Sequence, residues 1–265
     1  MNLLFLQPMN SFRYFLHFAY NGAGFHGWQI QPNAHTVQEE LQNALSVLTG
    51  AKILLTGAGR TDTGVHARDF YAHFDFNLFL NDAELYQLVY KLNRFLPPAI
   101  WIKDAFMVNS DVHARFSAIS RTYHYYLSRT KNPFDGNQTW IYTSPLNTEL
   151  MERAAEVIML YSDFTCFSKS GTQTSTNDCI IYESFFIQKN NLLIYHVKAN
   201  RFLRNMVRAI VGTLIEVGKE NVSIERLHEI IRKGTRSEAG MSVPAHGLFL
   251  EDIEYPSDYR DSGVK

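Results

Sequence analysis

Apolar and polar positions along the chain follow two different periods, and their order predicts a mixed α+β fold. Aromatic-rich alternating runs, such as residues 12–20, are typical of strands, because successive strand side chains point to opposite faces. Apolar residues three and four positions apart predict helices, as at residues 36–49, where Thr36 and Glu39 form a capping box. We expect strands at residues 12–20, 52–57, 69–77, 101–108, 121–129, 180–188, 192–199 and 247–254, and helices at 36–49, from 81 onward, and at 147–160, 202–217 and 223–233.

The order of these elements repeats along the chain. Residues 11–110 have the order β-α-β-β-α-β of a ferredoxin-like unit, and residues 111–256 repeat it with insertions. We therefore expect an α+β fold of two ferredoxin-like halves side by side, with an active-site cleft between them. This duplication depends on element order alone, because the halves share almost no letters. Residues 1–10 are expected to be an N-terminal appendage, and residues 257–265 a C-terminal tail.

Composition indicates a globular protein. The chain has 265 residues, of which 46% are hydrophobic and 19% are charged, and this length is enough to bury a core. The net charge is −1, so a nucleic-acid partner would need positive charge gathered locally. Cys166 and Cys179 form neither a metal-ligand pattern nor a disulfide framework, and the ten histidines show no ligand spacing. No apolar run is long enough to cross a membrane. We expect a cytoplasmic protein without a metal site.

The stretch TGAGRTDTGVHAR at residues 56–68 is the richest candidate for chemistry. Its three glycines let the backbone turn tightly and let another molecule approach the main chain. Arg60 lies two residues before Asp62, and a neighbouring positive charge favours the ionised form of a carboxylate. Asp62 is therefore a candidate attacking or proton-accepting group, although Asp and Gly also build ordinary turns. His66 lies in the same stretch, where we expect a structural role.

The same letters also allow a different enzyme. Asp62, Thr63 and Gly64 form the triplet of aspartic proteases, which need two carboxylates that share a proton. A second candidate, Asp-Ser-Gly at residues 261–263, lies at the end of the chain with no strand after it. Arg60 would also oppose the sharing of a proton. A protease is therefore the weaker interpretation.

Residues 59–67 have the pattern G-R-T-D-x-G-V-H-A, which resembles the catalytic loop of the TruA family of tRNA pseudouridine synthases. Further stretches resemble other motifs of that family, in the same order, so that the resemblance covers most of residues 12–256. These stretches are F-x-G-W-Q-x-Q at residues 25–31, A-R-x-S-A with R-x-Y-x-Y at 114–125, F-x-x-x-M-V-R at 202–208, and P-A-x-G-L-x-L at 244–250.

The resemblance implies a reaction and the residues that carry it. Uridine at positions 38–40 of the tRNA anticodon stem-loop would be isomerised to pseudouridine without a cofactor. Asp62 would be the catalytic carboxylate, by attack on C1′, attack on the base, or removal of a sugar proton. Arg60 and Arg208 would keep Asp62 charged and hold the phosphate beside the flipped nucleotide, while Tyr123 and Leu248 would sandwich its base. The family also implies a homodimer, with the tRNA crossing both subunits.

Three arginines recur beside the apolar positions of the helix expected at residues 202–217. Arg201, Arg204 and Arg208 are spaced by three and four residues, so they share one side of that helix. A row of this kind is either a solvated surface, where ion pairs contribute little, or a site for phosphates. We favour contact with RNA phosphates for Arg201 and Arg204.

Tyr123 also has an ordinary interpretation, because most tyrosines in alternating runs pack in a core. Tyr125 and Tyr126 fit that role better, and only the motif selects Tyr123. A further alternative is an RNA-binding module without catalysis. Such a module would keep the arginines but would gain nothing from Asp62 and Tyr123.

Overall fold

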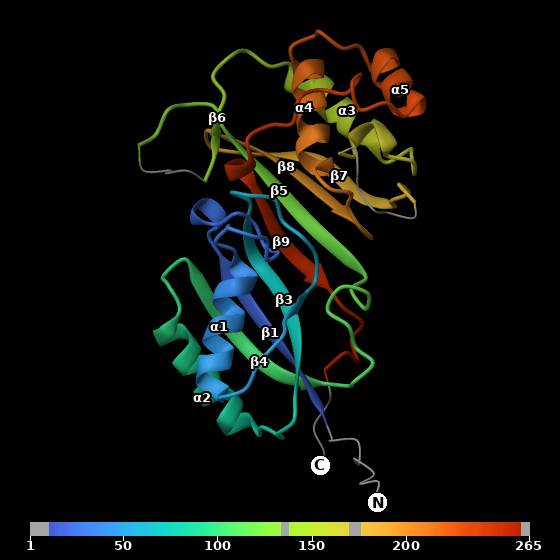
Figure 1. The fold of residues 1–265 in the computed structure, drawn as a ribbon. Coiled ribbons are helices and arrows are strands. Elements are labelled where there is room, and N and C mark those ends of the chain that lie inside the picture. Colours follow the sequence, from blue (N-terminus) through green and yellow to red (C-terminus); the bar gives the residue numbers. More distant parts are fainter. Residues whose placement is uncertain (1–10, 134–137, 170–175, 261–265) are drawn as a thin grey trace, which may run out of the picture.

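The computed structural model describes residues 11–133, 138–169 and 176–260. Within these ranges, the backbone forms one nine-stranded, mainly antiparallel sheet with five α-helices, so the mixed α+β prediction is confirmed. The expected appendage at residues 1–10 lies outside the described residues, as do residues 261–265 of the expected tail. Figure 1 shows the sheet running through the whole molecule, with helices beside the strands of each half.

Residues 11–110 contribute four strands and two helices, namely β1 (Phe12–Tyr20), α1 (Val37–Thr49), β2 (Thr56–Gly57), β3 (His66–Phe76), α2 (Asp82–Phe95) and β4 (Ile100–Val108). β1 lies between β3 and β4 and is antiparallel to both, and β2 pairs with β3. Thr36 and Asn81 cap the two helices through their side chains, as the sequence predicts. Apolar faces of both helices join the aromatic side chains of β1 and β3 in one buried cluster.

The second half supplies the remaining elements, namely β5 (Ser120–Ser128), β6 (Trp140–Ile141), α3 (Thr148–Ile158), β7 (Ile181–Lys189), β8 (Leu192–Ala199), α4 (Met206–Gly218), α5 (Ile224–Lys233) and β9 (Leu248–Glu254). β5 lies between β8 and β9, antiparallel to both, and β7 pairs with the far side of β8. α4 is buried along most of its length, which confirms the expectation from its apolar spacing.

Two expected boundaries are wrong for identifiable reasons. The helix expected at residues 202–217 begins at Met206, because Asn205 before it has a φ of 66°, in the left-handed region where a helix cannot continue. The strand expected at residues 52–57 is reduced to β2. In the residues before β2, side chains of α1 bind backbone N–H groups that a strand would use for pairing. Ser46 accepts from the N–H of Ile53, and Gln42 accepts from the N–H of Leu55.

A short parallel ladder joins the two halves into a single sheet. β3 and β9 pair only at His66 with Phe249 and at Ala67 with Leu250. The buried side chains nevertheless form two clusters, one centred on each half. Asp62 lies in the loop that precedes β3, and this loop therefore enters the sheet where the halves meet (Figure 1).

His73 on β3 gives the fold an acid-sensitive point. Its Nδ1 accepts a hydrogen bond from the N–H of Ala114 at 3.1 Å, which requires the neutral ring. Burial, together with the positive charge of Arg13, lowers the pKa of His73 from 6.5 to about 4. Because the unfolded chain binds the proton first, stability is expected to fall as the pH drops from about 6.5 to about 4.

Urea unfolding measured across this pH range tests the expectation. His73→Asn keeps an acceptor near the position of Nδ1 but cannot take up a proton. Its unfolding free energy is expected to change less steeply with pH than that of the wild type. Parallel curves for the two proteins would show that His73 does not contribute to the acid sensitivity.

Candidate active site

Asp62 lies in the loop between β2 and β3, and its carboxylate faces arginines of the other half. The side chain is 27% exposed, so a ligand can reach it. Arg204 Nε lies 3.7 Å from Oδ1, and Arg208 Nη1 lies 3.6 Å from Oδ2. A carboxylate from the first half is thus placed between two guanidinium groups from the second half.

The two arginines are held differently. Arg208, in the first turn of α4, is only 20% exposed, and its Nε donates to the carbonyl of Val243 at 2.7 Å. That bond fixes the guanidinium plane while Nη1 faces Asp62. Arg204 precedes the helix and is 59% exposed. Arg208 is therefore the anchored partner of the carboxylate, and Arg204 is the partner that solvent and substrate can reach.

The motif at residues 25–31 forms the support of the Asp62 loop. The backbone N–H of Trp28 donates to the carbonyl of Thr61 at 3.2 Å, and the backbone N–H of Gly64 donates to the carbonyl of Phe25 at 3.4 Å. Gly27 has a φ of 87°, and a Cβ built on it would lie 2.4 Å from the Thr61 carbonyl oxygen. Only glycine allows this approach. Two motifs far apart in sequence thus form one packed unit.

Buried polar contacts fix the same loop from the other side. The hydroxyl groups of Tyr20 and Thr61 lie 2.8 Å apart. His66 Nδ1 accepts from the N–H of Gly22 at 3.1 Å, so its Nε2 carries the hydrogen that faces the carbonyl of His246 at 3.2 Å. His66 therefore links the loop after Asp62 to both halves, which is a structural role.

Tyr123 on β5 is half-buried beside the charged groups. Its ring packs edge-to-face on Phe202, with centroids 5.1 Å apart. Burial raises the pKa of the Tyr123 phenol to about 12, while Arg121 acts to lower it and the Asp62 carboxylate to raise it. The phenol is therefore neutral at ordinary pH, within the electrostatic influence of Asp62. The neighbouring Tyr125 is fully buried and donates to the carbonyl of Pro244 at 2.9 Å, so it is a core residue.

The remaining expected site residues are Leu248, Arg60 and Arg201, and they differ in burial and in the contacts they make. Leu248 is buried at the start of β9, opposite Tyr125 in the strand register. Arg60 is exposed, and within the described ranges Asp62 pairs with Arg204 and Arg208 rather than with Arg60. Arg201 donates to the carbonyl of Thr176 at 3.4 Å. The structure thus brings Arg204 to the place beside Asp62 that the sequence assigned to Arg60.

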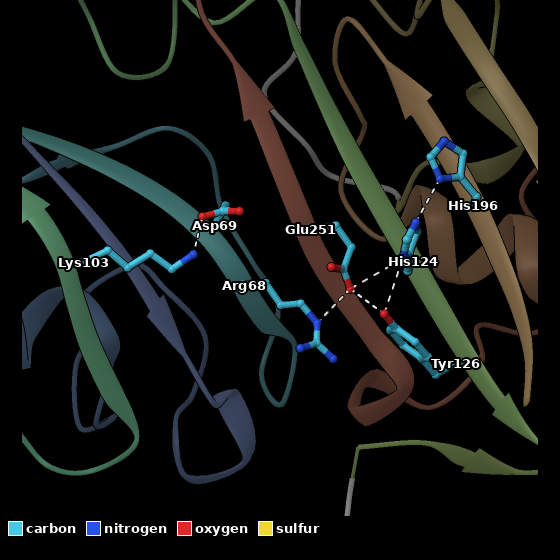
Figure 2. Close-up of polar contacts among 7 residues, drawn as sticks. All are labelled: Arg68, Asp69, Lys103, His124, Tyr126, His196 and Glu251. Carbon is cyan, nitrogen blue, oxygen red and sulfur yellow. Dashed lines mark hydrogen bonds and ion pairs between the residues drawn. The ribbon is translucent and has the colours of Figure 1, made fainter. Parts of the chain in front are cut away.

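A polar network that the sequence did not indicate crosses the junction of the halves (Figure 2). Arg68 on β3 pairs with Glu251 on β9 at 3.1 Å, and the Tyr126 hydroxyl donates to the same carboxylate at 2.7 Å. His124 on β5 and His196 on β8 lie 2.9 Å apart at their ring nitrogens. The network continues the short ladder between β3 and β9 by side-chain contacts.

The part of the chain that the structure describes holds neither a cluster of metal ligands nor a membrane-spanning helix. No three His, Cys, Asp or Glu side chains gather there as metal ligands. None of the helices there has both the length and the apolar character needed to span a bilayer.

Known proteins resemble this chain over almost its whole length. A family model described as tRNA pseudouridine synthase matches residues 161–256 and defines the class of enzyme, an isomerase that converts uridine to pseudouridine. tRNA pseudouridine synthase A of Parabacteroides distasonis is 45% identical over 246 residues, covering 93% of this chain and 97% of that protein. The enzyme of the same name from Porphyromonas gingivalis is 46% identical over 249 residues, covering 93% and 98%. That of Clostridium acetobutylicum is 38% identical over 238 residues, covering 89% and 96%.

The chain belongs to the tRNA pseudouridine synthase A (TruA) family. Membership makes it an enzyme of tRNA processing, so the aspartic protease and the catalytically silent binding module are both set aside. Residues 261–263, the second triplet of the protease interpretation, lie outside the described residues.

Proposed function

We propose that this protein isomerises uridine at positions 38–40 of the tRNA anticodon stem-loop, with Asp62 as the catalytic carboxylate. One observation carries the proposal, namely an accessible carboxylate held between Arg204 and Arg208 of the opposite half. The reaction breaks the bond from C1′ to N1 of uracil and forms a bond from C1′ to C5. The C5 proton is lost and N1 gains one. Asp62 serves this exchange by attack on C1′, attack on the base, or removal of a sugar proton.

The nucleotide must leave its stem to reach Asp62. Extrusion costs about a few kcal/mol, and stacking on an aromatic ring returns roughly 1–3 kcal/mol. We assign that stacking to Tyr123, a half-buried residue that packs against Phe202, and the opposite side of the base to Leu248. Arg204 is exposed enough to hold the phosphate of the flipped nucleotide. Arg60 and Arg201 are assigned to further phosphates of the RNA.

We infer two ferredoxin-like halves with the active-site cleft between them, and the strand orders support the division into two such halves. The first half has the order β4-β1-β3-β2, and the second half has the equivalent order β9-β5-β8-β7. We further propose the homodimer that the family resemblance implies, with tRNA bound across both subunits, which would let a chain with a net charge of −1 present a basic groove made from two copies. Its place of action is the cytoplasm, where tRNA is matured.

The test uses purified protein and a tRNA transcript that carries uridine at positions 38, 39 and 40. Pseudouridine is expected at one or more of these positions and nowhere else in the transcript. A matched transcript with cytidine at all three positions is expected to remain unmodified. Pseudouridine formed equally in both transcripts would contradict the assigned substrate positions.

Arg208→Ala is expected to reduce kcat/KM more than Arg204→Ala. The anchored Arg208 is partly buried, and its loss leaves Asp62 without its fixed counter-charge, which we expect to cost about 100-fold. Loss of the exposed Arg204 is expected to lower kcat/KM by about tenfold, because solvent screens its contact with Asp62. Arg226→Ala, which removes an exposed pair with Glu229 on α5, is the control and should retain full activity. The reverse order of effects would assign the anchoring role to Arg204.

A further inference from the structure

Arg121 on β5 joins separate chain segments through one guanidinium group. Its Nη1 donates to the carbonyls of Ala118 at 3.1 Å and Asn200 at 2.9 Å. Its Nη2 donates to the carbonyls of Ala58 at 3.2 Å and Arg115 at 2.6 Å. All four acceptors are backbone oxygens rather than carboxylates. The planar fork of arginine suits this arrangement, since a lysine ammonium cannot reach carbonyls on both sides at once.

The bonded segments are those that carry the charged centre. Ala58 is almost fully buried and lies four residues before Asp62 in the same loop. Asn200 directly follows β8, at the start of the segment that carries Arg204 and Arg208, and its own side chain accepts from the N–H of Ile180 at 2.8 Å. A single guanidinium group thus binds the base of the loop from the first half and the base of the arginine segment from the second half.

The position of Arg121 is costly for a charged group. Burial lowers the pKa of its guanidinium, which shows that the surroundings disfavour the charge. Carbonyl dipoles offset part of that penalty, but an apolar residue would avoid it altogether. A charge kept in such surroundings is better explained by the geometry that its four hydrogen bonds impose. The four N–H groups of its two terminal nitrogens are also occupied by backbone carbonyls, so they are not free to bind a substrate phosphate.

We propose that Arg121 is a positioning residue that sets the separation between Asp62 and the two arginines that face it. The proposal rests on the proposed function, and it deepens that function by naming the group that aligns the two halves of its site. Misplacement of a reacting group by about 1 Å typically costs about 100-fold in rate. Arg121→Lys, which keeps the charge and loses the fork, should therefore lower kcat by about 100-fold.

Arg129→Lys is the matched control. Arg129 lies just beyond the far end of β5 and likewise donates from both terminal nitrogens to backbone carbonyls, those of Tyr142 and Ser144, each at 2.8 Å. Both variants should lose a similar amount of melting temperature, but only Arg121→Lys should lose kcat. The dissociation constant for tRNA is expected to stay within about threefold of the wild-type value in both. A kcat of Arg121→Lys within threefold of that of Arg129→Lys would overturn the proposal.

A double variant tests whether Arg121 acts through the charged pair. If it positions Asp62 against the arginines, Arg121→Lys combined with Arg204→Ala should lose less kcat than the product of the two single losses. Losses that multiply would show that Arg121 acts elsewhere, and would refute the positioning role.

One readout does not depend on catalysis. A crystal structure of Arg121→Lys is expected to show the Asp62 carboxylate displaced from Arg208, while that of Arg129→Lys keeps the wild-type distance of 3.6 Å. An unchanged distance in Arg121→Lys refutes the positioning role even if activity falls. A wild-type protein that modifies no tRNA refutes the proposed function instead, and these structures still decide the role of Arg121.

Discussion

Asp62→Asn and Asp62→Ala are expected to abolish pseudouridine formation while the protein still folds and binds tRNA. Both variants lack the carboxylate to which the proposed function assigns the reaction, and loss of a group that acts directly in catalysis commonly costs about 10³-fold or more. The fold should tolerate both changes, because the side chain is partly exposed and its ion-pair contacts lie at 3.6 and 3.7 Å. The measurements are pseudouridine formed per enzyme, the melting temperature and the tRNA dissociation constant.

Asp75→Asn provides the matched control for this loss of charge. Asp75 pairs with Arg13 through two hydrogen bonds, of 2.7 and 2.9 Å, near the end of β3 remote from the Asp62 loop. Its replacement should leave kcat near the wild-type value. Activity of Asp62→Ala within tenfold of wild type would remove the catalytic assignment. Loss of tRNA binding in Asp62→Asn would instead assign Asp62 to recognition.

Gly27→Ala is expected to have the second largest effect. The added Cβ would lie 2.4 Å from the Thr61 carbonyl oxygen, which is too close for two atoms that are not bonded. Because that oxygen belongs to the backbone and cannot rotate away, either the 25–31 loop or the Asp62 loop must shift. A shift of about 1 Å at Asp62 corresponds to a loss of about 100-fold in kcat. The φ of 87° adds backbone strain on the order of 1 kcal/mol for an alanine. Activity and the melting temperature are measured together.

Two other glycines separate the causes. Gly50 also has a positive φ, of 69°, but a Cβ there meets no atom within 4 Å, so Gly50→Ala carries the strain without the clash. Gly24 lies in the same region of the chain as Gly27 and has open space around it. Both control variants should keep full kcat, with a lower melting temperature for Gly50→Ala only. If Gly27→Ala and Gly50→Ala lose kcat equally, the loop contact has no catalytic importance.

The sequence predicts well what short segments decide. Alternation located most strands, and the side-chain caps Thr36 and Asn81 placed the beginnings of α1 and α2 within a residue. Predictions fail where contacts with distant parts of the chain, rather than the local pattern, decide the structure of a segment. Residues 53 and 55 look like a strand, yet side chains of α1 satisfy their backbone groups. The left-handed conformation of Asn205 also leaves no periodic signal.

In the candidate site too, sequence motifs indicated some residues that the structure brings together, while residues brought in by tertiary packing were missed. The resemblance to the family singled out Asp62 and Arg208, which the structure places together. It assigned the second cation to Arg60, its neighbour in sequence, whereas Arg204 approaches from the other half. The role of Gly27 was not recognised either, because a close approach between two backbones depends on tertiary packing. The R-x-Y motif contained the only available signal for Arg121, and that motif drew attention to Tyr123 instead.

The central position of β9 in the sheet determines when the complete sheet can form during translation. β9 is the last strand in the described chain, yet it lies between β3 and β5 at the middle of the sheet. Domains generally begin to fold as they leave the ribosome, N-terminal part first. The segment with Asp62 is therefore synthesised long before the strand that brings its arginines alongside. A nascent chain that stops short of residue 248 lacks the strand that joins its halves, so the Asp62 loop and the facing arginines come together only after β9 has been synthesised.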